Sequence, residues 1–297
     1  MSDRRFGGPI LVTGGAGQVA RALAAAAAGR PVLRVGREAV DFDRPDLILP
    51  WLRDHKPGLI VNAAAYTSVD RAESEPEAAD RANRDGPARL AAYAAEAGIA
   101  LIHISTDYVF DGLKGAPYVE TDLPTPTGVY GRSKLAGEQA VAASGARAIV
   151  LRTSWVYAEA GRNFVLTMLN AAKKMSQLRV VADQRGCPTA AADLAAAILA
   201  IADRLADGWD DRLGGLYHAA GEGETTWHGL AEAVFARAER HGLTRPTVTP
   251  IATADWPTPA RRPPDSRLAC DKLHRSFGVR LPDWHDSLTR TVDAIFA

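Results

Sequence analysis

The stretch that decides the fold lies near the amino-terminal end and reads Pro9-Ile10-Leu11-Val12-Thr13-Gly14-Gly15-Ala16-Gly17-Gln18-Val19-Ala20. An apolar run ends at Thr13, glycines follow, and an alanine-rich segment then continues without a breaker to Gly29. This order predicts a buried strand, a tight turn and a helix. Small residues let the backbone approach a phosphate, and the start of the helix offers free N–H groups, so the turn predicts a dinucleotide site. A simple turn without a ligand is the alternative.

The rest of the first half repeats this pattern. Apolar runs predict further strands at 31–35, 58–65, 99–105 and 148–153, with helical segments between them at 46–54, 74–98 and 135–143. The second of these helical segments is expected to be interrupted near Gly86-Pro87. Strands that alternate with helices at this spacing predict an α/β fold, a Rossmann-type doubly wound parallel sheet.

The pattern changes after residue 153. The alternation is lost, and residues 244–264 contain six prolines. We therefore expect residues 1–153 to form a dinucleotide-binding domain, with 179–203 returning to it. Residues 154–297 are expected to form most of a smaller α/β substrate domain.

Composition narrows the class of protein. The 297 residues include 35 basic and 35 acidic side chains, and 47% are hydrophobic, which is typical of a soluble globular protein. A net charge of zero argues against a nucleic-acid or anionic-membrane partner. The cysteines Cys187 and Cys270 form no CxxC and the histidines show no ligand spacing, so no metal is expected. Met1 to Arg5 lack the apolar run of a signal peptide, and a cytoplasmic protein is expected.

A candidate catalytic pair lies in Tyr130-Gly131-Arg132-Ser133-Lys134. On a helix, Tyr130 and Lys134 share one face. A nearby ammonium lowers the pKa of a phenol, which can then give a proton to a carbonyl as a hydride arrives. Thr106 ends a predicted strand, where open α/β sheets bind ligands, and its hydroxyl could hold the substrate oxygen. The alternatives are a surface aromatic at Tyr130 and a turn residue at Thr106.

The segment after the second predicted strand bears on the choice of cofactor. An acid there would bind the adenosine ribose, whereas arginine accommodates a 2′-phosphate. Arg37 occupies this place, which favours NADPH over NADH, although Arg37 could equally be a solvated surface residue. Asp41 and Phe42 follow, and they either flank the adenine or, for Asp41, cap the next helix.

These residues lie in segments that together resemble the extended short-chain dehydrogenase/reductases, and among them the dTDP-4-dehydrorhamnose reductase family. Ser-Thr-Asp-Tyr-Val-Phe-Asp-Gly at 105–112 and Arg-Thr-Ser-Trp-Val-Tyr at 152–157 are specific to this family rather than to the wider fold. The matching segments cover nearly the whole chain in order: 61–67, 72–76, 105–112, 130–138, 152–157 and 262–268.

The resemblance implies reduction of the 4-keto group of dTDP-4-dehydro-6-deoxy-L-mannose to dTDP-L-rhamnose, the last step of dTDP-rhamnose synthesis, with NADPH, or alternatively NADH. It implies that Tyr130 is the proton donor with Lys134 as its partner, and that Thr106, Asp107 and Trp155 contact the sugar. The implied cofactor contacts are Gly17, Gln18, Val19, Asp41, Phe42, Ala65, Tyr66 and Thr67. Arg262 could pair with the nucleotide diphosphate, because its fork suits phosphate oxygens, or lie in a solvated loop.

Other functions remain open at this point. A dehydratase would need a further carboxylate after Asp107, where this chain has Tyr108. An epimerase, a reductase of a sister dTDP-4-keto-6-deoxy sugar and a non-catalytic NADP-binding regulatory subunit share the fold. The presence of Thr106, Tyr130 and Lys134 together favours a catalytic reductase, acting as a monomer or a homodimer.

Overall fold

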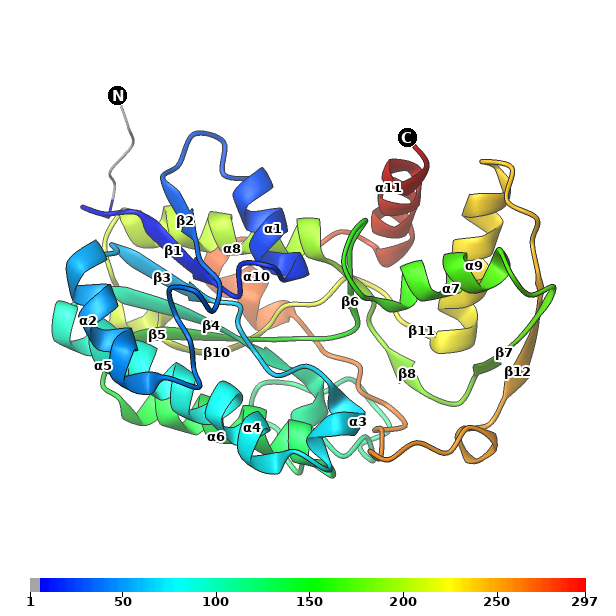
Figure 1. The fold of residues 1–297 in the computed structure, drawn as a ribbon, viewed down its shortest axis with the longest axis horizontal. Coiled ribbons are helices and arrows are strands. Elements are labelled where there is room, and N and C mark those ends of the chain that lie inside the picture. Colours follow the sequence, from blue (N-terminus) through cyan, green and yellow to red (C-terminus); the bar gives the residue numbers. More distant parts are fainter. Residues whose placement is uncertain (1–5) are drawn as a thin grey trace.

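A parallel sheet forms the centre of the molecule in the computed structural model, which describes residues 6–297 (Figure 1). Met1 to Arg5, which entered the expectation about a signal peptide, lie outside the described residues. The sheet contains β1 (Ile10–Thr13), β2 (Val32–Arg34), β3 (Leu59–Asn62), β4 (Ala100–Thr106), β5 (Arg147–Thr153) and β10 (Gly215–His218). All six strands are parallel, in the order β10-β5-β4-β3-β1-β2. The order reverses beside β1, which is where such sheets bind ligands.

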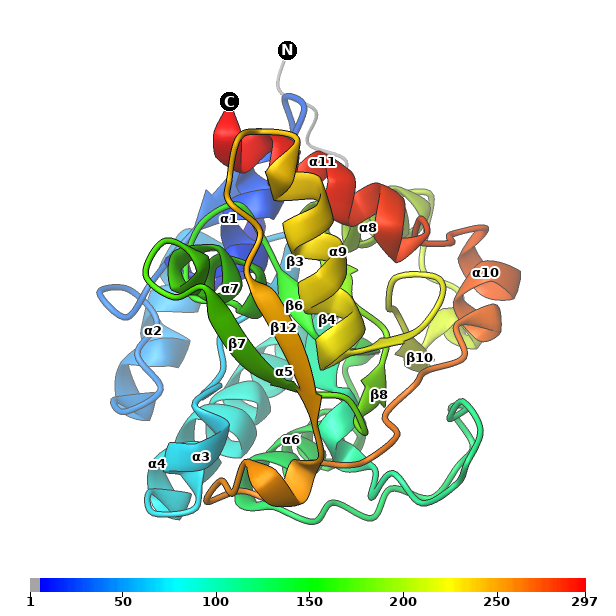
Figure 2. The same cartoon turned by 90° about the vertical axis from the view of Figure 1, so that its right-hand side faces the viewer.

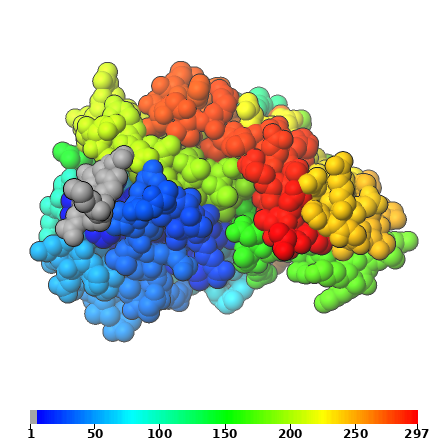
Figure 3. All heavy atoms as spheres, turned by 90° about the horizontal axis from the view of Figure 1, so that it is seen from above, coloured from blue at the N-terminus to red at the C-terminus, as the bar shows by residue number. Residues whose placement is uncertain are grey.

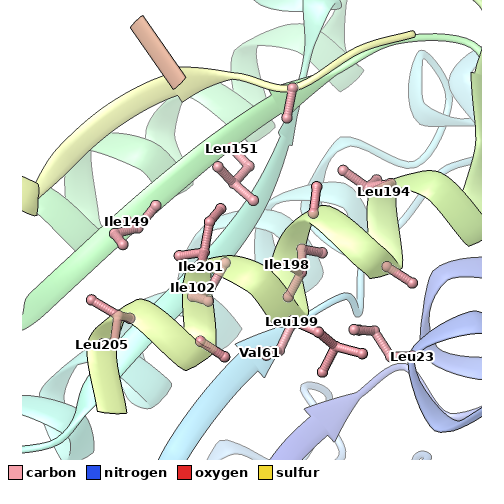
Figure 4. Close-up of a cluster of buried hydrophobic side chains, with 14 of the residues drawn as sticks. Leu23, Val61, Ile102, Ile149, Leu151, Leu194, Ile198, Leu199, Ile201 and Leu205 are labelled. Atoms are coloured by element: carbon pink, nitrogen blue, oxygen red, sulfur yellow. The ribbon is translucent and has the colours of Figure 1, made fainter. Parts of the chain in front are cut away.

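Helices cover both faces of the sheet. One face carries α2 (Pro45–His55), α5 (Gly86–Ala97) and α6 (Val129–Ala143), and the other carries α1 (Gln18–Ala25), α8 (Ala191–Ala206) and α10 (Asp271–Phe277) (Figure 1). Alternate residues of each strand enter the two cores, as at β1, where Val12 faces α1 and α8 while Leu11 faces α2 and α5. Figure 4 shows α8 laying Leu194, Ile198 and Leu205 across the strands. The predicted doubly wound fold is therefore confirmed.

A second apolar core lies at the other end of the molecule. It is built from α7 (Phe164–Ala172), α9 (Trp227–Glu239) and α11 (Trp284–Phe296) and from the parallel pair β7 (Gln177–Val181) and β12 (Thr247–Ile251). Figure 2 shows β7 and β12 side by side with α9 behind them, and Figure 3 shows α11 in red toward the same end of the molecule. The short pairs are β6 (Val156–Tyr157) with β9 (Thr189–Ala190) and β8 (Arg185–Gly186) with β11 (Thr225–Thr226).

The structure differs from the expected elements in three places. β10 is a sixth strand, and β10 and α10 bring residues from beyond 203 back to the sheet. The region expected as one interrupted helix consists of α3 (Val69–Ala72), α4 (Pro76–Asp80), a π-helical turn η1 (Arg81–Asp85) and α5. The expected break therefore falls in η1, directly before Gly86. α6 begins at Val129, so Tyr130 lies in its first turn.

The remaining elements are short 3₁₀ turns: η2 (Asp107–Val109), η3 (Asp211–Leu213) and η4 (Thr253–Asp255). Among residues 6–297, no helix combines the length and the apolar character that crossing a membrane requires.

Two glycines allow α6 to pack tightly against its neighbours. A Cβ at Gly131 would overlap the carbonyl oxygen of Tyr108, and a Cβ at Gly137 would overlap that of Asn83 in η1. Backbone lies against backbone at both points, so neither contact can be relieved by turning a side chain. These two glycines therefore set the distance between α6 and the segments that follow β3 and β4.

A buried ion pair fixes α6 to the sheet. The Arg152 guanidinium on β5 donates to both carboxylate oxygens of Glu138, at 2.9 and 2.6 Å. Their side chains are only 2% and 8% exposed. The Ser105 hydroxyl on β4 also donates to Glu138, and the Phe110 ring lies 4.9 Å from the guanidinium carbon of Arg152. Removing either charge would leave the other buried without its counter-ion.

Gly137→Ala tests the close approach of α6 to η1. Alanine favours an isolated helix by about 1 kcal/mol, but the overlap with Asn83 is expected to reverse this sign and lower the free energy of unfolding by about 1–3 kcal/mol. Urea unfolding measures the change, with the exposed Gln139→Ala on the same helix as a control that should stay within about 0.5 kcal/mol of the parent. A more stable Gly137→Ala variant would contradict this packing.

Arg152→Met tests the buried ion pair. The carboxylate of Glu138 is then buried without its cation, and we expect a loss of about 3–5 kcal/mol in the free energy of unfolding. The matched control is the double variant Glu138→Leu with Arg152→Met, which removes both charges and should recover most of the loss. If the double variant is as unstable as Arg152→Met, packing rather than charge explains the effect.

Candidate active site

The glycine turn after β1 forms a cradle at the point where the strand order reverses. Gly14 has φ +75°, and a Cβ there would lie 2.8 Å from the Ala63 carbonyl oxygen. A Cβ at Gly15 would lie 2.8 Å from the Val35 carbonyl carbon. Gly17 precedes α1 in an extended conformation, and its cap has no side-chain hydrogen bond. The backbone is therefore open to a phosphate at the start of α1, and these residues fit the pyrophosphate of a dinucleotide.

A row of buried polar side chains lies below this turn. The Thr13 hydroxyl donates to Asn62 Oδ1 at 2.6 Å, and Asn62 Nδ2 donates to His103 Nδ1 at 2.9 Å. Burial, together with the Lys134 ammonium, holds the pKa of His103 well below its usual range, so the ring is neutral. The row fastens the ends of β1 and β3 to the middle of β4.

α6 places three functional groups on one face. Tyr130, Lys134 and Glu138 follow at intervals of four residues, and Glu138 faces the sheet through its pair with Arg152. Lys134 is buried, and its Nζ donates to the Ile104 carbonyl oxygen at 2.6 Å. Burial lowers the pKa of Lys134 to about 8, while the nearby Glu138 carboxylate raises it.

Tyr130 differs from the sequence-based expectation in its acidity. Burial raises its pKa to about 12, the Thr106 hydroxyl lowers it, and the Asp107 carboxylate raises it further. The Lys134 ammonium donates to the Ile104 carbonyl, and burial is the largest influence on the pKa of Tyr130. Tyr130 is therefore a neutral phenol that retains its proton until a base or a developing charge takes it.

Thr106 and Asp107 follow the end of β4, beside Tyr130. The Thr106 hydroxyl donates to Asp107 Oδ1 at 3.0 Å and accepts the Tyr108 N–H at 3.2 Å. Burial raises the pKa of Asp107 to about 7, against the hydroxyls of Ser266 and Thr106, which lower it. The Tyr108 ring meets Tyr130 edge to face, with ring centroids 5.7 Å apart. The structure thus brings Thr106, Asp107 and Tyr130 together, as the sequence predicts.

The segment after β3, which contains Ala65, Tyr66 and Thr67, is held by a residue that the sequence analysis did not identify. Asn83 in η1 accepts the Tyr66 N–H at 2.8 Å, and its Nδ2 donates to the Tyr66 carbonyl at 3.1 Å and to the Ser133 hydroxyl at 2.9 Å. The Tyr66 hydroxyl donates to Glu75. π-helical turns are frequent at functional sites, and this one connects α6 to the segment after β3.

The three residues expected around the adenosine lie in three different environments. Arg37 is exposed and pairs with Asp43 at 3.1 Å, and Arg81 shares the same carboxylate at 3.0 Å. Asp41 accepts the Asp43 N–H at 3.0 Å, so it closes a local turn ahead of α2. Phe42 is buried with its ring against Gly86, so it supports the loop from within the core.

Two residues expected at the substrate lie between the two cores. Arg262 donates to both oxygens of Asp70 in α3, at 2.6 and 2.8 Å, and so joins the segment after β12 to the sheet region. Trp155 follows β5 and stacks on Trp227 of α9, with ring centroids 3.5 Å apart and planes 9° apart. Over residues 6–297, no three His, Cys, Asp or Glu side chains gather in a way that could hold a metal ion.

The comparisons with known proteins agree on one family. The family model described as the RmlD substrate binding domain matches residues 8–296. The chain is 48% identical to a dTDP-4-dehydrorhamnose reductase of Sinorhizobium fredii over 289 residues, which cover 96% of this chain and 97% of the relative.

Solved structures give the same result. The dTDP-4-dehydrorhamnose reductase of Clostridium acetobutylicum superposes with a TM-score of 0.91 and 34% identity, covering 97% of this chain and 100% of that one. The enzyme of Bacillus anthracis, solved in complex with NADP, has a TM-score of 0.89 and 31% identity, covering 97% and 99%. With the family model, a close relative and these structures in agreement over almost its whole length, the chain belongs to the dTDP-4-dehydrorhamnose reductase family.

Proposed function

We propose that Tyr130, Lys134 and Thr106 carry the reaction of this family in the cleft above the carboxyl ends of β1, β3 and β4. The protein is an NADPH-dependent oxidoreductase that reduces the 4-keto group of dTDP-4-dehydro-6-deoxy-L-mannose to give dTDP-L-rhamnose. The observation that carries the assignment of residues is the shared face of α6, which places Tyr130 beside Thr106 and Lys134 beside the end of β4.

The cofactor supplies a hydride to the 4-carbon of the sugar when it is bound. Gly14, Gly15 and Gly17 would hold its pyrophosphate on open backbone, and the segment around Tyr66 would line its path toward Tyr130. Lys134, buried at the end of β4, is in a position to bind its ribose and to keep positive charge beside the reacting groups. Gln18 and Val19 lie in the first turn of α1, next to this cradle.

The proton comes from this chain. Tyr130 keeps its phenol neutral at physiological pH, because burial raises its pKa to about 12. As negative charge develops on the sugar O4, the phenol gives its proton to that oxygen. The Thr106 hydroxyl has one hydrogen, which it donates to Asp107 in this structure, and it would turn that hydrogen to O4 when the sugar binds.

We assign the substrate side to the second core and its connections. In this assignment Trp155 walls the sugar pocket. Arg262 would bind the nucleotide diphosphate by exchanging Asp70, to which its guanidinium now donates twice, for the phosphate oxygens. In this assignment residues 6–153, joined by β10 and α10, form the dinucleotide-binding domain, and 154–297 supply most of the substrate domain. The packing of α8 on α1 supports the return of 179–203 to the first domain.

Tyr130→Phe removes the proton donor and keeps the ring. We expect turnover to fall by about 10²–10⁴-fold, the usual contribution of a positioned general acid, with NADPH affinity unchanged. NADPH oxidation with the dTDP-4-keto sugar measures the first quantity, and equilibrium binding of NADPH measures the second. Turnover equal to that of the parent would remove Tyr130 from the mechanism.

Arg37→Ala tests the recognition of the 2′-phosphate. If Arg37 exchanges Asp43 for that phosphate, the KM for NADPH should rise by about tenfold, as expected for one charge-assisted hydrogen bond, and the KM for NADH should stay nearly constant. Arg53→Ala is the matched control, because Arg53 is also exposed and paired with a carboxylate, but lies on α2 and not in the loop after β2. Equal changes for both cofactors would show that Arg37 does not contact the 2′-phosphate.

A further inference from the structure

Trp155 has a backbone conformation that large residues rarely adopt. It follows β5 immediately after Ser154, whose hydroxyl donates to the Cys187 carbonyl at 2.6 Å. Its φ is +46°, in the left-handed region. For a residue with a Cβ this region costs about 1–2 kcal/mol, so the surroundings must hold Trp155 there. Because Thr153 pairs with Thr106 in the sheet, the strained residue lies close to the proposed reaction centre.

Two residues of the second core hold the indole of Trp155. Trp227 covers one ring face in a parallel stack, with centroids 3.5 Å apart. Gly186 lies against the indole so closely that a Cβ there would overlap Cε2 of Trp155. Since β8 pairs with β11, Gly186 and the residue before α9 are fixed relative to each other. The position of the indole is therefore set by the second core and not by β5 alone.

Trp227 is itself fixed from several sides. Its Nε1 donates to Gln184 Oε1 at 3.1 Å, and Gln184 is buried and donates in turn to the Thr253 hydroxyl at 3.0 Å. The Phe164 ring packs on it at 4.7 Å. The Thr226 hydroxyl accepts the Gly229 N–H at 3.0 Å and so caps α9 directly before Trp227. A half-buried tryptophan with this many partners is a rigid support.

We propose that Trp227 is a positioning residue for the sugar: it holds Trp155 in its left-handed conformation, so that the free part of the Trp155 indole meets the apolar surface of a nucleotide-linked 6-deoxyhexose. This inference rests on the proposed function, because it takes Trp155 as the wall of the sugar pocket. Aromatic side chains bind through broad apolar surfaces of defined orientation, and a small displacement of such a wall misplaces the reacting carbon. Trp227 acts through Trp155 and does not need to touch the reacting atoms.

The test compares Trp227→Ala and Trp227→Phe with the parent. We expect Trp227→Ala to raise the KM for the dTDP-4-keto sugar by roughly tenfold or more, as for loss of an aromatic contact together with misplacement of the wall, while the KM for NADPH stays within about twofold. Trp227→Phe keeps a ring in the stack and should recover most of the loss. If Trp227 served stability alone, Trp227→Ala would change the KM for the sugar and the KM for NADPH little. Trp227→Phe would then have no selective loss of sugar affinity to restore.

Trp51→Ala is the matched control. Trp51 is also a partly buried, stacked tryptophan, with its ring 3.7 Å from that of His55, but it lies on α2 in the cofactor half. It should leave the KM for the sugar unchanged. Calorimetry with dTDP-L-rhamnose provides a second readout without turnover, in which Trp227→Ala should weaken binding by a similar factor.

The outcomes separate this inference from the proposed function. If Trp155→Ala raises the KM for the sugar and Trp227→Ala does not, Trp155 needs no support and the inference is overturned. If Trp155→Ala has no effect either, Trp155 is not the pocket wall and the inference fails with it. If the parent binds dTDP-L-rhamnose but does not reduce the keto sugar, the proposed function fails, while weaker binding by Trp227→Ala would still support the positioning role.

Discussion

The buried pair of Glu138 and Arg152 is the interaction on which the rest of the site depends. It connects three segments that the chain places far apart: the helix with Tyr130 and Lys134, the end of β4 through Ser105, and β5 shortly before Trp155. A buried pair contributes little net stability, because desolvation offsets most of its attraction. We infer that its effect is to fix the position of α6, since a shift of the helix along the sheet would separate the two buried charges. The pair thereby holds the helix that carries the proposed catalytic groups Tyr130 and Lys134.

The same burial that makes this pair rigid also sets the protonation of the site. Asp107, Lys134 and Tyr130 lie close together, and burial shifts the pKa of each in the direction that favours its neutral form. It raises the pKa of Asp107 to about 7, lowers that of Lys134 to about 8 and raises that of Tyr130 to about 12. Groups whose pKa values are separated in this way can take different roles at one pH. In the proposed mechanism Tyr130 is the proton donor, Lys134 supplies positive charge, and Asp107 accepts from the Thr106 hydroxyl. The sequence indicated the residue types, but the raised pKa of Tyr130 comes first from burial, which the sequence alone does not show.

The sequence predicts what short-range pattern encodes. The run from Pro9 to Ala20 and the alternation after it were sufficient for five of the six strands, and β1 to β5 lie where they were expected. β10 was missed because it is four residues long, Gly215–His218, and draws its stability from pairing with β5 rather than from its own composition. Asn83 and Trp227 were missed for a related reason. Each contacts partners that are distant in the sequence, and a single amino-acid sequence contains no signal that predicts such contacts.

Two further contacts show how the halves of the molecule combine at the cleft. Asn163, which caps α7, donates to Gln18 in the first turn of α1 at 2.8 Å, and Arg262 pairs with Asp70 on the other side. Each contact includes one residue proposed to bind a ligand: Gln18 for the cofactor and Arg262 for the nucleotide sugar. A dinucleotide at the glycine turn and a nucleotide sugar beside Arg262 would therefore each meet a side chain that already joins the two cores. A ligand that draws Gln18 or Arg262 to itself would therefore have to replace one contact between the two cores.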